Sequence, residues 1–190
     1  MYFSAFILTA LATAAFTSAT PLVPGRMCQG RQAITSTQYI GAEKNVKLDI
    51  ITCEGIADSA TIESGVGALL ESRQTASVCD APCTTFCHDP AGGGPDPNDC
   101  HIIADALRFE SQSISPTFEI DNGANNVVSL TFSSCTSFFL NQASTGLNYC
   151  RTDFASLTDF LSTNCQATQN AHGGLCVAND GRWFVQVQHS

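Results

Sequence analysis

The sequence is poor in basic residues. Only eight of its 190 residues are Lys or Arg, against 17 Asp and Glu, and the formal net charge is −9. The eight cations never cluster, so the counterion release that drives nucleic-acid binding has no evident source. The same shortage disfavours attraction to an anionic membrane surface. We therefore expect no nucleic-acid partner and no membrane insertion.

Long apolar runs are also scarce, and the longest lies at the amino terminus. The stretch 5–16 is largely apolar and is followed by Thr17-Ser18-Ala19, a run of small residues typical of a cleavage site. No other stretch approaches the ~20 apolar residues that span a bilayer. We expect residues 1–19 to be a signal peptide, and the mature protein to be secreted and extracellular.

Recognisable catalytic motifs are missing as well. The sequence has neither a G-x-S-x-G elbow nor an H-E-x-x-H motif, and no cysteine is expected to stay free beside a histidine. The four histidines have no spacing that favours a two-histidine ribonuclease. A glycoside hydrolase needs two carboxylates. Nothing singles out a pair among Glu110, Glu119, Asp121, Asp153 and Asp180. We expect a protein that is not an enzyme and has no catalytic residues.

Cysteine, by contrast, is abundant. An even number in an exported chain predicts a framework of disulfides. Zinc binding at Cys83-x-x-x-Cys87-His88 is the competing interpretation, but zinc sites favour closer pairs. We therefore expect no metal and no cofactor. Sequence leaves the connectivity open, and a local Cys28–Cys53 bridge is only a hypothesis. The ten residues are Cys28, Cys53, Cys79, Cys83, Cys87, Cys100, Cys135, Cys150, Cys165 and Cys176.

Alternating apolar residues predict several strands. The clearest segments are 46–51, 117–120, 127–133, 136–140, 175–178 and 182–188. In the last segment, Trp183, Val185 and Val187 fall on one face and Phe184 on the other. The turn residues Asp121-Asn122-Gly123 between two segments predict an antiparallel meander.

Two helices have clear patterns. The first is expected to begin at a cap formed by Asn98 or Asp99 and to end before Ser115-Pro116. Its inner stripe consists of Cys100, Ile103, Ala104 and Leu107. The second covers 152–163, and its stripe consists of Phe154, Leu157, Phe160 and Leu161. A weaker pattern predicts a short helix over 60–70.

The order of these elements predicts an α+β fold. We expect a single disulfide-rich αβ sandwich in which an antiparallel sheet of about four to five strands packs with helices. Residues 20–78 are expected to form an N-terminal extension, and 79–190 a cysteine-rich domain. Cys79, Cys83 and Cys87 are spaced by four, which predicts a half-buried turn with three sulfurs on one helical face and different partners for each.

The lone tryptophan suggests carbohydrate recognition. Such recognition needs a flat aromatic face for the sugar ring and planar amide or charged groups for its hydroxyls. Trp183 lies beside a turn, and other suitable groups lie next to a predicted strand. The alternative is that Trp183 packs in the core, as a tryptophan on a terminal strand more often does. The glycan-binding candidates are Trp183, Arg182, Asp180, Asn141, Asn148 and Tyr149.

Several short motifs follow one another between Cys79 and the end of the sequence. They are Cys79-x-x-x-Cys83-Thr84-Thr85-x-Cys87, a Gly/Pro loop, Pro97-Asn98-Asp99-Cys100-x-Ile102-Ile103-x-Asp105-Ala106-Leu107, Cys135, Asn148-Tyr149-Cys150, and Gly173-Gly174-x-Cys176 before Trp183. This pattern resembles the mushroom Y-three-like glycan-binding domain. The resemblance implies a secreted, non-catalytic fungal lectin with a role in defence or toxicity. It also implies binding of N-acetylgalactosamine-containing or fucosylated glycans, and a homodimer formed by joining sheet edges, for which an unpaired final strand would serve.

Two other functions stay open. Secreted killer-toxin-like or effector proteins also place Asp-Cys at a helix start, and such a protein would act on a target cell without needing a sugar. A cell-wall hydrolase would instead turn over a polysaccharide.

Overall fold

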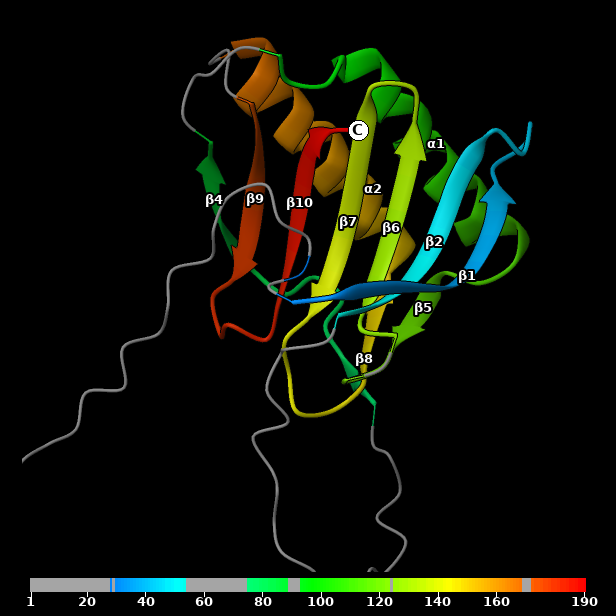
Figure 1. Ribbon diagram of the computed structural model, residues 1–190, viewed down its shortest axis with the longest axis vertical. Helices are drawn as coiled ribbons and strands as arrows, with labels where there is room; N and C mark the ends of the chain where they lie inside the picture. The colour runs from blue at the N-terminus through cyan, green and yellow to red at the C-terminus, as the bar shows by residue number, and fades with distance from the viewer. Residues whose placement is uncertain (1–27, 29, 54–74, 89–92, 124, 169–171) are drawn as a thin grey trace, which may run out of the picture.

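The computed structural model describes residue 28 and residues 30–53, 75–88, 93–123, 125–168 and 172–190. The expected signal peptide at 1–19 and the predicted helix at 60–70 lie outside these residues. Within them, a broad sheet forms one layer and two helices form a second layer behind it (Figure 1).

The main sheet has seven strands, and every neighbouring pair is antiparallel. In spatial order the strands are β1 (Gln32–Ile40), β2 (Val46–Cys53), β6 (Val127–Phe132), β7 (Cys135–Asn141), β10 (Trp183–His189), β9 (Gly173–Ala178) and β4 (Cys83–Cys87). A second, three-stranded sheet consists of β3 (Ala76–Ser77), β8 (Leu147–Cys150) and β5 (Thr117–Ile120). Because β5 pairs with β8, the predicted meander from β5 into β6 is wrong; the turn after β5 connects the two sheets.

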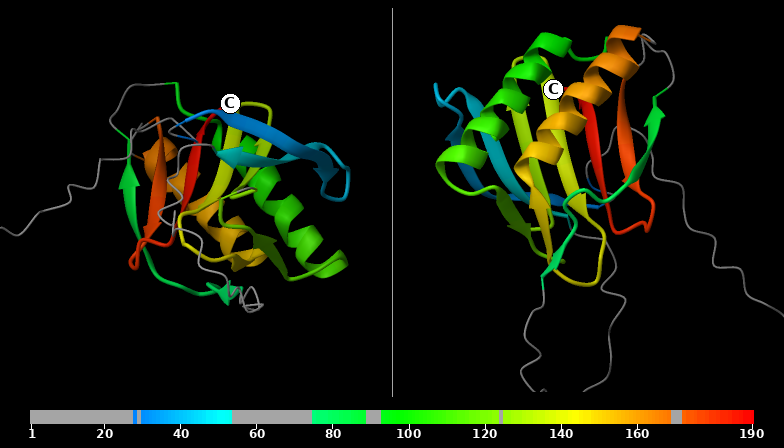
Figure 2. Two further views of the ribbon diagram at one scale, coloured as in Figure 1. Left: turned by 60° about the horizontal axis from the view of Figure 1, so that its bottom comes forward. Right: turned by 180° about the vertical axis from the view of Figure 1, so that it is seen from behind.

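Two helices cover the rear face of the main sheet (Figure 2). They are α1 (Pro97–Ser113) and α2 (Arg151–Leu161), and a π-helical segment, Ser162–Thr168, continues α2. The cap of α1 is Asp96, whose carboxylate accepts from the Asn98 amide at 2.9 Å, and Pro97 follows at the first helical position. The predicted cap at Asn98 or Asp99 is therefore wrong. The Asp99 carboxylate instead accepts from the backbone and hydroxyl of Ser134, which fixes α1 to the β6–β7 turn.

The core follows from the alternation of strand residues. Trp183, Val185 and Val187 of β10 face the helices and are buried with Ile103 and Leu107 of α1, as the sequence predicts. The opposite face of the sheet carries a second buried cluster, which contains Phe184. Its other members are Cys28, Ile51, Cys53, Val127, Phe138 and Leu140.

All ten cysteines form disulfides. The pairs are Cys28–Cys53, Cys79–Cys150, Cys83–Cys176, Cys87–Cys165 and Cys100–Cys135. The local Cys28–Cys53 hypothesis and the expectation of different partners for Cys79, Cys83 and Cys87 are confirmed. The predicted helical turn is wrong, because Cys83 and Cys87 lie on β4. Residues four apart share a face on a strand as well as on a helix, so the spacing alone could not separate them.

The expected α+β sandwich with a sheet of four to five strands is wrong, because the fold is dominated by strands. About 45% of the structure is in strands and 25% in helices. Two strands of the main sheet, β1 and β2, come from the expected N-terminal extension at 20–78, and β2 pairs with β6 over Lys47–Ile51. Another strand of the main sheet, β4, is formed by the cysteine-rich segment for which the sequence predicted a helical turn. The extension is thus continuous with the sheet of the expected domain at 79–190.

The final strand does not have an unpaired edge. It is β10, which lies between β7 and β9 in the sheet, so the expectation of a free final strand is wrong. The outer strands are β1 and β4. Among the described residues, no helix combines the length and apolar character needed to cross a membrane.

Candidate functional site

The predicted aromatic site residues lie in the core. Trp183 is 0% exposed and stacks on Phe139 with ring centroids 5.5 Å apart. Tyr149 is 1% exposed and lies 5.0 Å from the Trp183 ring, and burial raises the pKa of its hydroxyl. A ring without exposed surface cannot stack on a sugar. The alternative that Trp183 packs in the core is therefore the one that fits its position.

Asn141 is also fully engaged inside the protein. Its side-chain amide donates to the carbonyls of Ile120, Asp121 and Thr145 at 3.0–3.1 Å. Its oxygen accepts from the Ala143 amide at 2.8 Å. These bonds hold the end of β5 and the loop after β7, so Asn141 shapes a turn and has no amide hydrogen left for a ligand.

The remaining candidates are scattered. Asn148 is half-buried in β8, and its buried Oδ1 has no hydrogen-bond partner. Asp180 and Arg182 lie in the exposed β9–β10 turn, where the Arg182 Nε donates to Asp180 Oδ2 at 2.7 Å. The backbone and side chain of Arg182 both lower the pKa of Asp180. The six predicted residues therefore do not converge on one surface.

An open hollow lies instead on the outer side of the helix layer. It has a volume of about 550 Å³ and is lined by Arg108, Ser156, Asp159, Phe160, Thr163 and Asn164. The Phe160 residue is 48% exposed, although an aromatic side chain at this place in a helical stripe is normally buried. An exposed ring beside charged and hydroxyl groups is the combination that the sequence predicted around Trp183.

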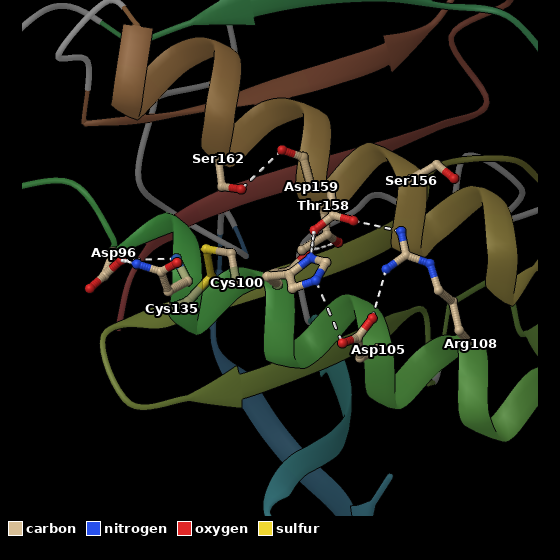
Figure 3. A network of polar contacts seen from close by, with 12 residues as sticks. Asp96, Cys100, Asp105, Arg108, Cys135, Ser156, Thr158, Asp159 and Ser162 are labelled. Carbon is tan, nitrogen blue, oxygen red and sulfur yellow. Dashed lines mark hydrogen bonds and ion pairs between the residues drawn. A yellow bond between two sulfur atoms is a disulfide. The ribbon is translucent and has the colours of Figure 1, made fainter. Parts of the chain in front are cut away.

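Figure 3 shows a network of ion pairs between α1 and α2, and two of its members, Arg108 and Asp159, line this hollow. Asp159 of α2 accepts from Arg108 Nη2 at 2.5 Å and contacts His101 Nδ1 at 2.9 Å. On α1, Arg108 Nη1 also donates to Asp105 at 2.9 Å, and Asp105 lies 3.6 Å from His101 Nε2. The three α1 residues share one helix face because they are spaced by four and three.

The charges in this network support one another. The hydrogen bond to Asp159 raises the pKa of His101, and the bond to the same carboxylate raises the pKa of Arg108. Arg108 is therefore always charged. With His101 neutral, two carboxylates and one guanidinium leave a net charge of −1, which becomes zero when His101 is protonated. The network therefore carries no net positive charge that would attract an anionic ligand.

The Ser156 hydroxyl, which lines the hollow, is not placed to act as an activated nucleophile. The Ser156 hydroxyl donates to the Thr152 carbonyl at 2.8 Å, which directs its proton to the backbone instead of a base. Among the carboxylates considered for a hydrolase, Glu110 accepts from the Gly41 amide and Asp153 from the Asp80 amide. None of those five carboxylates lines the hollow. Its groups can bind and orient a ligand.

One group of described residues has potential metal-ligand atoms close together: Cys79, Cys150 and Asp153. The two sulfurs are joined in a disulfide, so neither can act as a thiolate ligand. Asp153 alone does not make a metal site.

Sequence reasoning missed Phe160 by assigning it to the inner stripe of α2. Phe154 and Leu161 are buried as predicted, and Leu157 is half-buried. The buried face of α2 is formed by Phe154, Ala155, Thr158 and Leu161. At about 100° per residue, Phe160 lies on the opposite side of the helix from the centre of that face. The predicted stripe was therefore shifted around the helix, because it left out the small and polar residues Ala155 and Thr158.

The fold and the cystines define a small, cysteine-rich protein dominated by its sheet. No protein-family model matches the chain, no curated protein matches its sequence, and no solved structure matches it. The resemblance to mushroom Y-three-like domains therefore stays a prediction.

Proposed function

We propose that this is a secreted, non-catalytic glycan-binding protein that binds sugar in the hollow beside Phe160. The observation that carries the proposal is the half-exposed Phe160 ring next to the Asp159–Arg108 ion pair. A ring of this kind can pack on the apolar face of a pyranose. The neighbouring charged and hydroxyl groups can hydrogen-bond the sugar hydroxyls.

The site is ordered before a ligand arrives. Asp159 is held by both Arg108 and His101, so its carboxylate loses little conformational freedom on binding. Arg108 has five N–H donors, and its two bonds to Asp105 and Asp159 leave others for a ligand. Five disulfides further support a rigid protein made for an oxidising compartment, and so support secretion.

The test is a glycan array probed with the mature chain, residues 20–190, made in an oxidising system. Phe160→Ala should abolish binding or weaken it at least about tenfold, because the ring supplies the stacking surface. Phe86→Ala is the matched control, since Phe86 is 52% exposed on β4 and away from the helix layer. Trp183→Ala is not a useful site variant, because removing a buried ring costs about 3–5 kcal/mol of stability.

Each other result points to a different function. Binding that survives Phe160→Ala keeps the lectin and removes this site. A folded protein that binds no glycan sinks the lectin proposal and favours an effector or killer-toxin-like role, which a target-cell toxicity assay would measure. Release of sugar from a polysaccharide would indicate a hydrolase.

We further propose that the expected homodimer pairs through β1. This outer strand is uncharged, and eight of its nine residues are exposed, which suits edge-to-edge pairing. Sedimentation should show a dimer for the wild type and a monomer for Ile34→Lys, because a charge on an edge strand opposes pairing. A monomeric wild type would contradict this prediction without affecting the sugar site.

A further inference from the structure

A second hollow lies on the same helix layer, at the turn between β1 and β2. It has a volume of about 200 Å³, and its lining includes Asn45 of the turn with Asp105 and Phe109 of α1. Phe109 is 42% exposed. The turn is fixed against α1 because the Gly41 amide donates to the buried Glu110 carboxylate at 3.1 Å. This hollow is therefore also formed before any ligand binds.

The two hollows share three kinds of side chain, although the rest of their linings differ. Each has an exposed phenylalanine, an aspartate of the ion-pair network, and an asparagine. The trios are Asn45, Asp105 and Phe109 in one hollow, and Asn164, Asp159 and Phe160 in the other. The asparagines come from unrelated segments of the chain, so no repeat in the sequence accounts for the match.

One side chain joins the hollows. Arg108 lines the larger hollow, and it bonds Asp159 on that side and Asp105 on the other. Figure 3 shows the guanidinium between the two carboxylates. The linings of the two hollows are thus joined by the ion pairs of Arg108 with Asp105 and Asp159, and an extended ligand that crosses these ion pairs would contact both hollows.

This inference rests on the glycan-binding function proposed above. We infer that the two hollows are subsites for units of one linear, neutral homo-oligosaccharide. The asparagine, aspartate and phenylalanine that the two hollows share suit the same sugar unit in each hollow. The excess of carboxylates in the network, and the formal net charge of −9, disfavour anionic sugars such as sialylated or uronic chains.

The experiment is calorimetry of the folded mature protein with two probe series. One series is β-linked N-acetylglucosamine oligomers and the other β-linked glucose oligomers, each from one to six units. In at least one series, affinity should rise by about tenfold or more as the chain becomes long enough to fill both hollows. Phe109→Ala and Phe160→Ala should each remove that rise. Ile114→Ala is the control, since Ile114 is exposed at the end of α1 and lines neither hollow.

The outcomes separate this inference from the proposed function. If Phe160→Ala abolishes glycan binding while Phe109→Ala leaves the six-unit affinity unchanged, the single site stands and the two-subsite inference falls. Array binding limited to anionic or single-sugar ligands also overturns the inference and keeps the lectin. If the protein binds no glycan at all, both fall. Thermal melts of each variant establish that a loss of binding is not a loss of folding.

Discussion

The two outer edges of the main sheet are held in different ways. At β4, Cys83 and Cys87 are bonded to Cys176 and Cys165, and Cys79 just before the strand is bonded to Cys150. These bridges close sequence separations of 71 to 93 residues. The β4 edge is therefore tied covalently to distant parts of the chain.

The β1 edge has one bridge, Cys28–Cys53, which closes a separation of only 25 residues. The far end of the β1–β2 hairpin is held without a covalent bond, by the hydrogen bond from Gly41 to Glu110 and by close packing on Ala106. This difference indicates that the β1 edge can separate from the rest of the protein more easily than the β4 edge can. The smaller hollow and the proposed dimer edge both belong to the side that depends on packing and hydrogen bonds.

Removing disulfides should give the largest effect and test the comparison directly. Replacing both Cys28 and Cys53 with Ala should cost about 3.5 kcal/mol of unfolding free energy, because this bridge alone closes its loop of 25 residues. Replacing both Cys83 and Cys176 should cost only about 3 kcal/mol, because the neighbouring Cys87–Cys165 bridge still joins the two segments through a path of about 15 residues. Denaturant unfolding of both variants measures the two losses. A larger loss at Cys83–Cys176 than at Cys28–Cys53 would contradict the expectation that the bridges of the β4 edge support one another.

A glycine substitution should have the next largest effect. Gly41 has φ +88°, and a Cβ added there would lie 2.9 Å from the Ala106 Cβ. Gly41→Ala therefore combines backbone strain with a steric clash, and we expect a loss of about 2–3 kcal/mol. The hairpin should separate from α1 near the smaller hollow.

Gly181→Ala is the control for backbone strain alone. Gly181 has φ +74° and no atom within 4 Å of an added Cβ, so the loss should be only about 1–2 kcal/mol. Thermal unfolding of both variants gives the comparison. If the two lose the same stability, the close contact between Gly41 and α1 does not contribute.

Sequence patterns predicted individual elements better than their assembly. The segment 117–120 matches β5 in both bounds, and the stripe of α1 is buried as predicted. Periodicity works here because each face of a strand or helix meets either core or solvent. Pairing was harder: nothing local to β2 indicates that it lies beside β6, about 80 residues away.

The candidate site was missed for a related reason. A tryptophan suits both a sugar site and a core, although on a terminal strand it more often packs in the core. The neighbouring rings of Phe139 and Tyr149 show that Trp183 lies inside. The ion pair between Arg108 and Asp159 joins residues 51 apart in sequence. Such long-range contacts depend on how α1 and α2 pack, which a single sequence does not specify.

The smallest effect concerns the ionic contact between α1 and α2, which is also non-covalent. Asp159 raises the pKa of His101 in the folded protein above its unfolded value, near 6.5. The contribution of the His101–Asp159 contact to the free energy of unfolding is therefore fully present below about pH 6.5. It is lost as the pH rises through the pKa of His101 in the folded protein. Because the His101 side chain is 57% exposed, the loss should stay under about 1 kcal/mol.

Thermal melts between pH 5.5 and pH 8.5 test this contact when the wild type is compared with His101→Gln. The wild type should melt at a higher temperature than the variant at low pH, and this difference in melting temperature should shrink as the pH rises. Added salt should also reduce the difference at low pH, because exposed charges are screened. The β4 edge should not contribute, since its disulfides do not titrate in this range. A pH-independent difference between the two proteins would mean that His101 acts by packing or neutral hydrogen bonding. Arg108 would then be the charged partner that holds Asp159, and the ion pairs between the two hollows would not respond to pH.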